Sequence, residues 1–142
     1  MLMGEYQHSL DNKGRMFMPS KFREELGDTV IVTLGLDNCL FAFPLDEFEK
    51  LKNKLDSLPL SNKDARQFVR FFFAGACECE TDKQGRIMIP AKLRSYAGLE
   101  KEVTVVGAST RLEIWDSKKW DDDYSFDHFS PDVLSEKLEG LL

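Results

Sequence analysis

Long apolar runs are missing from this sequence of 142 residues, and so is any secretion signal. No run reaches the roughly 18 apolar residues that a membrane-spanning helix needs. The opening residues, MLMGEYQHSL, lack the cationic segment, the apolar stretch and the small-residue cleavage site of a signal peptide. Cysteine is also scarce: Cys39, Cys77 and Cys79 are an odd number that cannot pair completely within one chain. We therefore expect a cytoplasmic protein with reduced thiols and no membrane segment.

The residues that catalysis or metal binding would require are few and poorly spaced. His8 and His128 stand in no Ser, Cys or acid arrangement typical of a catalytic site. The sequence has no phosphate-binding glycine loop, and it lacks the Gly-Ser pair at which barrel-type decarboxylases mature by cleavage. Cys77 and Cys79 should share one face of a strand, but zinc needs three or four ligands, usually at other spacings. We predict no enzyme activity, no cofactor and no metal site.

Positive charge is in deficit, because the net charge is −6. Nucleic-acid binding depends on Lys and Arg, so this value at first argues against a DNA partner. The excess acid, however, is concentrated at the C-terminus, where residues 116–142 carry eight acids and three lysines. Residues 1–115 then hold 17 acids and 16 bases, a net charge of −1. Since binding depends on the local field of a basic patch, the total charge does not exclude DNA.

The most informative feature that is present is an internal repeat. Residues 4–27 align without gaps onto residues 75–98, at an offset of 71 positions. One inserted residue later, 32–48 align onto 104–120. Shared turn chemistry would explain the glycines but not a repeated Lys-x-Arg pair, so we interpret the repeat as two copies of one structural unit. The identical pairs of the first alignment are Gly4/Gly75, Asp11/Asp82, Gly14/Gly85, Arg15/Arg86, Pro19/Pro90, Lys21/Lys92, Arg23/Arg94 and Gly27/Gly98.

Each unit has the pattern of two short strands around a tight turn, a short helix, and two further strands. Proline before Ser20 and before Ala91 suits the start of that helix. Hydrophobic residues at helical spacing predict further helices over 46–58, over 61–73 and from Ser130 onward. The expected strands cover residues 6–10, 15–18, 30–34 and 39–43, and then 77–81, 86–89, 103–106 and 112–115.

These elements divide the chain into two strand-rich units at 5–48 and 76–119, a helical linker at 49–75 and an acidic helical tail at 120–142. A strand-rich unit of about 45 residues is too small to bury a core alone, so the two units should share one. The expected fold class is α+β, mainly β. The linker helices either pack on this body or form contacts between subunits.

One motif of the repeat carries recognition chemistry: Asp-x-x-Gly-Arg, at 11–15 and again at 82–86. Gly14 and Gly85 permit the positive φ of a tight turn, which returns the Asp carboxylate toward the Arg guanidinium across a hairpin. Arg presents a planar fork of donors that suits a carboxylate, a phosphate or a guanine edge. Arg15 and Arg86 would then contact DNA bases, with Asp11 and Asp82 orienting them. Alternatively, each pair only braces a surface hairpin.

Further basic residues accompany both motifs. Lys13 and Lys83 lie inside the turns, and four more residues lie on the short helices that follow: Lys21, Arg23, Lys92 and Arg94. A two-stranded hairpin fits the major groove, where Arg reads guanine while lysines hold phosphates. We predict that these residues contribute phosphate contacts. For each lysine taken singly, a solvated surface charge is the alternative.

The sequence resembles the MraZ family of transcriptional regulators over essentially its full length. The resemblance rests on DNKGR (11–15) and DKQGR (82–86), each followed by an apolar triplet and Pro in a tandem SpoVT-AbrB-like unit. It implies a pseudo-dimeric swapped-hairpin β-barrel with peripheral helices. It also implies a homo-oligomeric ring, nucleoid association, and binding of double-stranded DNA at G-rich direct repeats in the promoter of the protein's own division and cell-wall gene cluster.

An alternative function is that of an AbrB-like, antitoxin-like module whose main role is to bind a protein partner. Such a module would need a disordered, partner-binding tail. Residues 124–142 instead carry Phe126, Phe129 and the start of a capped helix at Ser130, so they are expected to fold. The tail therefore favours the DNA-binding regulator.

Overall fold

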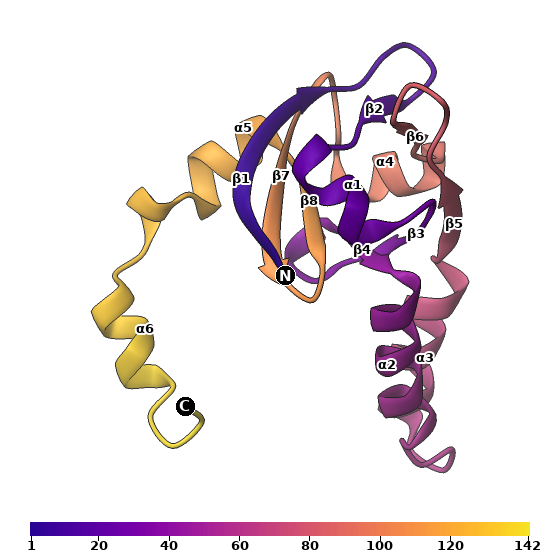
Figure 1. The fold of residues 1–142 in the computed structure, drawn as a ribbon. Helices are drawn as coiled ribbons and strands as arrows, with labels where there is room; N and C mark the ends of the chain where they lie inside the picture. Colours follow the sequence, from indigo (N-terminus) through magenta and orange to yellow (C-terminus); the bar gives the residue numbers. More distant parts are fainter.

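The computed structural model describes residues 1–142 and has an α+β architecture, as the sequence predicts (Figure 1). A six-stranded antiparallel sheet and a separate two-stranded ribbon are surrounded by six α-helices. None of these helices has the length and apolar character needed to cross a bilayer. The strands are β1 (Leu2–Ser9), β2 (Arg15–Phe17), β3 (Thr29–Leu34), β4 (Leu40–Pro44), β5 (Cys77–Glu80), β6 (Arg86–Met88), β7 (Glu102–Ser109) and β8 (Leu112–Asp116).

The helices occupy three places along the chain. Two short ones, α1 and α4, follow β2 and β6, and a helical hairpin, α2 and α3, joins the two repeat units. The C-terminal segment contains α5 and α6, separated by a π-helical turn (Trp120–Tyr124) and a 3-10 turn (Phe126–His128). The α-helices are α1 (Ser20–Leu26), α2 (Leu45–Asp56), α3 (Lys63–Ala74), α4 (Ala91–Ala97), α5 (Ser117–Lys119) and α6 (Pro131–Lys137).

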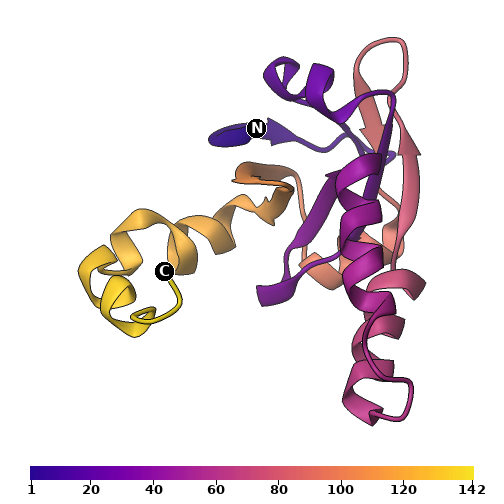
Figure 2. The same cartoon turned by 60° about the horizontal axis from the view of Figure 1, so that its bottom comes forward.

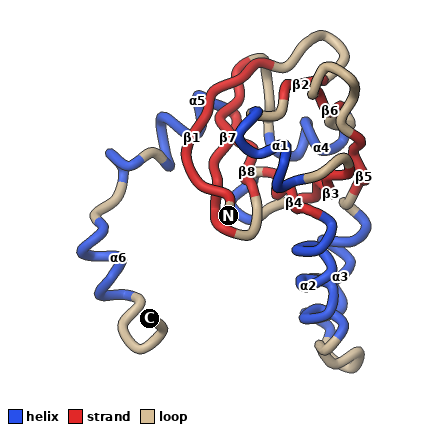
Figure 3. The backbone as a smooth tube through the Cα atoms, in the orientation of Figure 1, coloured by secondary structure: helices blue, strands red, loops and turns tan.

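Strand pairing crosses between the two repeat units (Figure 3). In the sheet order β1-β7-β8-β4-β3-β5, the first strand of each unit pairs with the third strand of the other. Tyr6 lies opposite Val105, and Cys79 lies opposite Val30. The ribbon joins β2 to β6, with Met16 opposite Ile87. The prediction that the strands flanking each turn form a local hairpin is therefore wrong. A unit of this size buries its apolar strand faces by pairing with its copy.

The barrel that the resemblance implies is not closed in this structure. The edge strands β1 and β5 do not pair with each other, and the β2–β6 ribbon forms a sheet of its own. Both ribbon strands are only three residues long, and each is followed within two residues by a proline, Pro19 or Pro90. Proline has no N–H to donate, so the ladder ends there and does not extend toward the larger sheet.

The main core lies between the six-stranded sheet and the ribbon, and both units contribute to it. Val30 and Val105 come from the sheet, Met16 and Ile87 from the ribbon, and all four are almost fully buried. Phe22 of α1 joins them, as does its counterpart Leu93 of α4. The repeat units therefore share one core, as their small size predicts.

A second, aromatic core covers the other face of the sheet. Phe41, Phe43 and Trp115 pack there against Phe72 of α3 and Trp120. The linker helices α2 and α3 run side by side and project from the body (Figures 1 and 2). They thus pack on their own chain at one end and extend away from it at the other.

Helices α3 and α6 begin at residues whose side chains cap the helix. The N-cap of α3 is Asn62, whose Oδ1 accepts a hydrogen bond from the Ala65 N–H at 3.0 Å. The sequence predicts this helix from Ser61, one residue too early, because Asn and Ser both cap helices well. Ser130 caps α6 as predicted, accepting from Val133 N at 3.4 Å. That helix stands away from the body, and every residue from 126 to 142 is exposed (Figure 2).

Candidate nucleic-acid interface

The ribbon brings the two Asp-x-x-Gly-Arg motifs together. In its register, Arg15 lies opposite Met88 and Phe17 lies opposite Arg86. Because side chains alternate between the faces of a strand, these four residues share one face of the ribbon. Met16 and Ile87, on the other face, are each 1% exposed. The two arginines therefore stand on one surface, on a support that is anchored in the core.

Within each turn the Asp carboxylate makes the same three hydrogen bonds. Asp11 Oδ1 accepts from the backbone N–H groups of Lys13 and Arg15, both at 2.9 Å, and its Oδ2 accepts from Arg15 Nε at 2.7 Å. Asp82 accepts from the backbone N–H groups of Gln84 and Arg86, and from Arg86 Nε, all at 2.9 Å. Each carboxylate thus closes its turn and holds the guanidinium that follows.

The guanidinium groups keep most of their donors. Only Nε of Arg15 and Nε of Arg86 are engaged, and their Nη atoms make no hydrogen bond within the chain. The side chains of Arg15 and Arg86 are 33% and 21% exposed. They are partly buried, but a ligand can still reach them. Because the carboxylate occupies only Nε, the two Nη atoms of each guanidinium keep parallel N–H groups. Two such donors can bind a guanine edge or a phosphate bidentately.

Both carboxylates are held in the ionised form. Hydrogen bonds from the Arg15 backbone N–H and then from its side chain lower the pKa of Asp11 to about 2. The equivalent bonds from Arg86 lower the pKa of Asp82. At neutral pH each Asp therefore carries its charge, and each Asp–Arg pair is intact.

The turn glycines are covered by arginines of the opposite unit. Gly14 and Gly85 have φ of 80° and 81° and are buried. A Cβ on Gly14 would lie 2.7 Å from Arg94 Cζ, and one on Gly85 would meet the Arg23 guanidinium. Glycine is needed at both positions, because of the backbone angle and because of the close approach.

Arg23 and Arg94 are consequently supports for the turns. Their Nε atoms donate to the carbonyls of Met18 and Ile89, each at 2.9 Å. The sequence predicts these arginines as phosphate contacts. Their packing across the turns adds a role that the sequence does not reveal, because the residues they cover belong to the other repeat unit.

The four lysines predicted to hold phosphates are exposed. Lys13 and Lys83 lie in the turns, and Lys21 and Lys92 take equivalent positions in α1 and α4. No carboxylate of the chain forms an ion pair with any of them. Their charge is therefore not neutralised locally, whereas the acidic C-terminal segment lies on another side of the body (Figure 1).

Phe17 and Met88 also belong to this surface, although the sequence interpretation treats them only as apolar. Phe17 is 47% exposed and Met88 is 51% exposed. The Arg86 Cζ lies 6.0 Å from the centre of the Phe17 ring. Strand alternation could have identified them, because each stands two residues after an Arg of the motif and so shares its face.

The cysteines show no ligand arrangement. The structure brings no three His, Cys, Asp or Glu side chains into a group that could hold a metal ion. Burial, followed by the neighbouring Cys77, raises the pKa of Cys79 to about 12, and burial raises the pKa of Cys39 as well. Both thiols therefore stay protonated at neutral pH.

Comparisons with known proteins agree with the repeat and the motif. The family model described as MraZ protein, a description that also likens it to antitoxins, matches residues 1–71 and then residues 72–130. A transcriptional regulator MraZ from Acetivibrio thermocellus is 58% identical to this chain over 141 residues, 99% of each chain. Its namesake from Caldicellulosiruptor saccharolyticus is 57% identical over the same span, also 99% of each chain. That from Desulforamulus reducens is 55% identical over 142 residues, the whole of both chains.

Proposed function

This chain belongs to the MraZ family of transcriptional regulators, and from that membership we propose that it binds double-stranded DNA sequence-specifically and regulates transcription. The family resemblance drawn from the two Asp-x-x-Gly-Arg motifs is confirmed, and the family is one of regulators and not of enzymes. One observation carries the proposal: two equivalent arginines, each fixed by its own carboxylate, stand on one face of one ribbon.

The ribbon is the element that enters the major groove, which admits a two-stranded β-ribbon. Arg15 and Arg86 direct their free Nη donors to guanine O6 and N7. Asp11 and Asp82 hold the arginines in place before DNA arrives, so less side-chain entropy is lost on binding. Phe17 and Met88, between the arginines, offer apolar contact to thymine methyl groups.

The basic residues around the ribbon hold the phosphates. Lys13 and Lys83 extend from the turns, and Lys21 and Lys92 from the helices behind them. Arg23 and Arg94 support the turns and add positive charge beside them. Phosphate contacts position the protein on the duplex but carry no sequence information. Their loss should therefore weaken binding to every duplex about equally.

The pairing of each unit's strands with those of the other supports a finer proposal, that the two repeats are interlocked halves of a swapped-hairpin pseudo-dimer. One ribbon spans few base pairs, so several copies acting together would bind regularly spaced sites more tightly through effective concentration. We accordingly propose a ring-shaped homo-oligomer on G-rich direct repeats in the promoter of its own division and cell-wall gene cluster. It would act in the cytoplasm, on the nucleoid.

The proposal is tested by selecting bound DNA from a random pool at stated salt, with wild type, Arg15→Ala and Lys21→Ala. Wild type should enrich a G-rich repeat. Arg15→Ala should lose about 1–3 kcal/mol of binding to that repeat and much less on random duplex. Lys21→Ala is the matched control, because loss of a phosphate contact weakens both duplexes alike. Equal losses for Arg15→Ala on both duplexes, or no enriched sequence, would contradict base reading.

A protein-binding, antitoxin-like role is the second candidate. The description of the family model favours it, and so does the exposed apolar surface of α6, where Val133 and Leu134 are both more than 40% exposed. A regulator should bind its DNA site without any added protein. If DNA binding appears only with a second protein present, the antitoxin-like role is the better description.

A further inference from the structure

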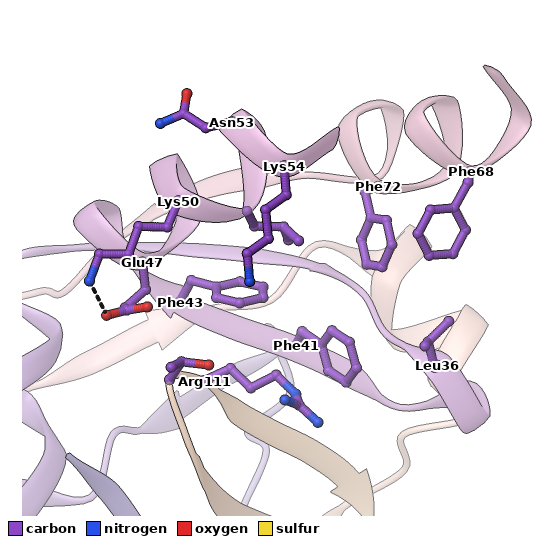
Figure 4. Close-up of a pocket in the computed structure, with 12 residues that line it drawn as sticks. Leu36, Phe41, Phe43, Glu47, Lys50, Asn53, Lys54, Phe68, Phe72 and Arg111 are labelled. Atoms are coloured by element: carbon purple, nitrogen blue, oxygen red, sulfur yellow. Dashed lines mark hydrogen bonds and ion pairs between the residues drawn. The ribbon is translucent and has the colours of Figure 1, made fainter. Parts of the chain in front are cut away.

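A groove crosses the outer face of the six-stranded sheet, between α2 and the turn that joins β7 to β8 (Figure 4). It has a volume of about 760 Å³. Phe41, Phe43 and Phe72 form its apolar floor, and Leu36 and Phe68, which are 48% and 40% exposed, lie at one end. Aromatic side chains that line an open groove of this size are typical of a binding surface.

The rim of this groove is basic. Lys50, Lys54 and Arg111 line it together with a single acid, Glu47, which gives a net charge of +2. Glu47 pairs with Lys50 at 3.0 Å, and Lys54 has no ion pair within the chain.

Arg111 is only partly satisfied at this rim. Its guanidinium lies 4.5 Å from the centre of the Phe41 ring and pairs through Nη2 with Glu113 at 2.8 Å. Its Nε is buried and has no hydrogen-bond partner. The charge of the rim that no carboxylate of the chain pairs with is therefore that of Lys54.

The chain itself contains a segment of matching chemistry. Helix α6 and its C-cap residue carry Leu134 and Leu138 four positions apart, and both side chains are 41% exposed. Its other face is polar. Residues 125–142 hold four acids, Asp127, Asp132, Glu136 and Glu139, and one lysine, a net charge of −3. A short amphipathic, acidic helix is the natural complement of an apolar groove with a basic rim.

In the structure α6 does not occupy the groove of its own chain. Tyr124 still packs on Trp115, with ring centres 4.4 Å apart, but the chain then leaves the body on the side away from the α2–α3 hairpin (Figures 1 and 2). An isolated copy thus leaves both the groove and the apolar face of α6 in water. Contact between copies would cover both surfaces at once.

We propose that the C-terminal helix of one copy binds in the groove of a second copy. This inference deepens the oligomer in the proposed function, because it assigns the two surfaces through which subunits meet. The two surfaces differ, so the contact is heterologous, and repeated head-to-tail contacts of this kind close into a ring when the rotation permits. Apolar contact supplies the attraction, and the opposite charges of rim and tail fix the orientation.

The first test measures the mass of the full-length protein by sedimentation equilibrium. Wild type should be oligomeric, and Leu134→Glu with Leu138→Glu should give a monomer, because acidic side chains cannot enter an apolar groove. Both leucines are exposed, so the fold should be unaffected, which circular dichroism would verify. The matched control is Leu58→Glu with Leu60→Glu at the exposed tip of the α2–α3 hairpin, outside the groove, and it should leave the mass unchanged.

The second test separates a neighbouring tail from the chain's own tail. Leu36→Glu with Lys54→Glu impairs the groove and leaves the tail intact, so this variant alone should also be monomeric. Mixed with the tail variant, it should form a dimer of one copy each, since one supplies a working tail and the other a working groove. A monomeric wild type would overturn the proposal, whether because the tail binds its own groove or because the groove serves a foreign protein. An oligomer that persists in either variant, or a mixture that stays monomeric, would overturn it too.

A third measurement keeps this inference distinct from the DNA-binding proposal. The monomeric tail variant should bind a single selected repeat as wild type does, but it should lose the additional affinity for several repeats in a row. If wild type selects no DNA sequence while the mass data follow the pattern above, the proposed function fails and the subunit contact stands. If DNA is selected but the masses do not change, the reverse holds.

Discussion

Arg15 and Arg86 depend on neighbours that belong to both repeat units. The carboxylate that holds each Arg comes from its own turn, whereas the guanidinium that covers each turn glycine comes from the other unit. The first relationship could be predicted from the sequence, because Asp and Arg stand four positions apart around a glycine. The second could not, because it depends on which strands pair. Four of the predicted DNA contacts are exposed lysines, as expected, and two are arginines that also support the turns.

Replacement of Gly14 by Ala should destabilise the protein for two separable reasons. A positive φ costs an L-residue about 1–2 kcal/mol, and the added Cβ would also displace the Arg94 guanidinium 2.7 Å away. Gly98→Ala is the matched control, because Gly98 has φ of 62° but nothing lies within 4 Å of a Cβ placed there. Urea unfolding should give a larger loss for Gly14→Ala than for Gly98→Ala. Equal losses would show that the Arg94 contact contributes nothing.

The Asp–Arg pairs should also produce a pH dependence at acid pH. The pKa of Asp11 is about 2 in the folded protein, below its ordinary value of 3.8. A depressed pKa stabilises the fold fully above the ordinary value, and this contribution disappears as pH falls toward 2. An NMR titration of the Asp11 carboxyl carbon should therefore have its midpoint near 2, and Asp11→Asn should remove this part of the pH dependence of unfolding. A midpoint near 3.8 would show that the three hydrogen bonds do not persist in solution.

At the scale of elements, local patterns predict most strands and helices but not their partners. Alternating and helical periodicities place the eight strands and the helices at 20–26, 45–56 and 91–97 within a few residues. The pairing of β1 with β7 and of β3 with β5 joins strands that lie far apart in the sequence. It depends on the burial of apolar strand faces from both repeat units. Nothing in the local sequence distinguishes it from two separate hairpins. The β-barrel is likewise implied by the family resemblance and by no local residue pattern, and the sheet does not close.

We expect the inner face of the ribbon to contribute to stability and its outer face to DNA binding. Met16 is 1% exposed and lies in the shared core, so Met16→Ala should cost about 2–5 kcal/mol of unfolding free energy. Phe17 is its exposed neighbour, and Phe17→Ala should cost less than about 1 kcal/mol. Phe17→Ala should nevertheless lower the affinity for the selected DNA repeat while the fold stays intact. The measurements are urea unfolding and fluorescence anisotropy. A stable Phe17→Ala variant with unchanged affinity would remove Phe17 from the interface.

At the scale of the whole molecule, charge and packing are distributed differently along the chain. Most of the acid excess lies in the C-terminal segment, which lies apart from the ribbon (Figure 1), so a chain with a net charge of −6 still carries four unpaired lysines in the two turns and on the short helices that follow them. The sequence reveals this segregation from counts alone. The core, by contrast, is spread over both units, and Val30 and Val105 bury the same interior from opposite halves. The Asp-x-x-Gly-Arg motif is thus duplicated, whereas the core is shared.

Shared stability leads to a prediction about the separated halves. Insertion of a protease site at the exposed tip near Leu60 gives fragments 1–60 and 61–142, and cleavage at such a tip should leave the native pairing intact. After cleavage the fragments should stay together under native conditions. Purified alone, neither should melt cooperatively as a monomer, because each lacks the strands that cover its apolar faces. A fragment that does fold should do so as a dimer of itself, with a melting temperature that rises with concentration, since each unit resembles its missing partner. A monomeric fragment with a concentration-independent transition would mean that one unit holds a complete core, and the ribbon would then have to be a contact between two independent domains.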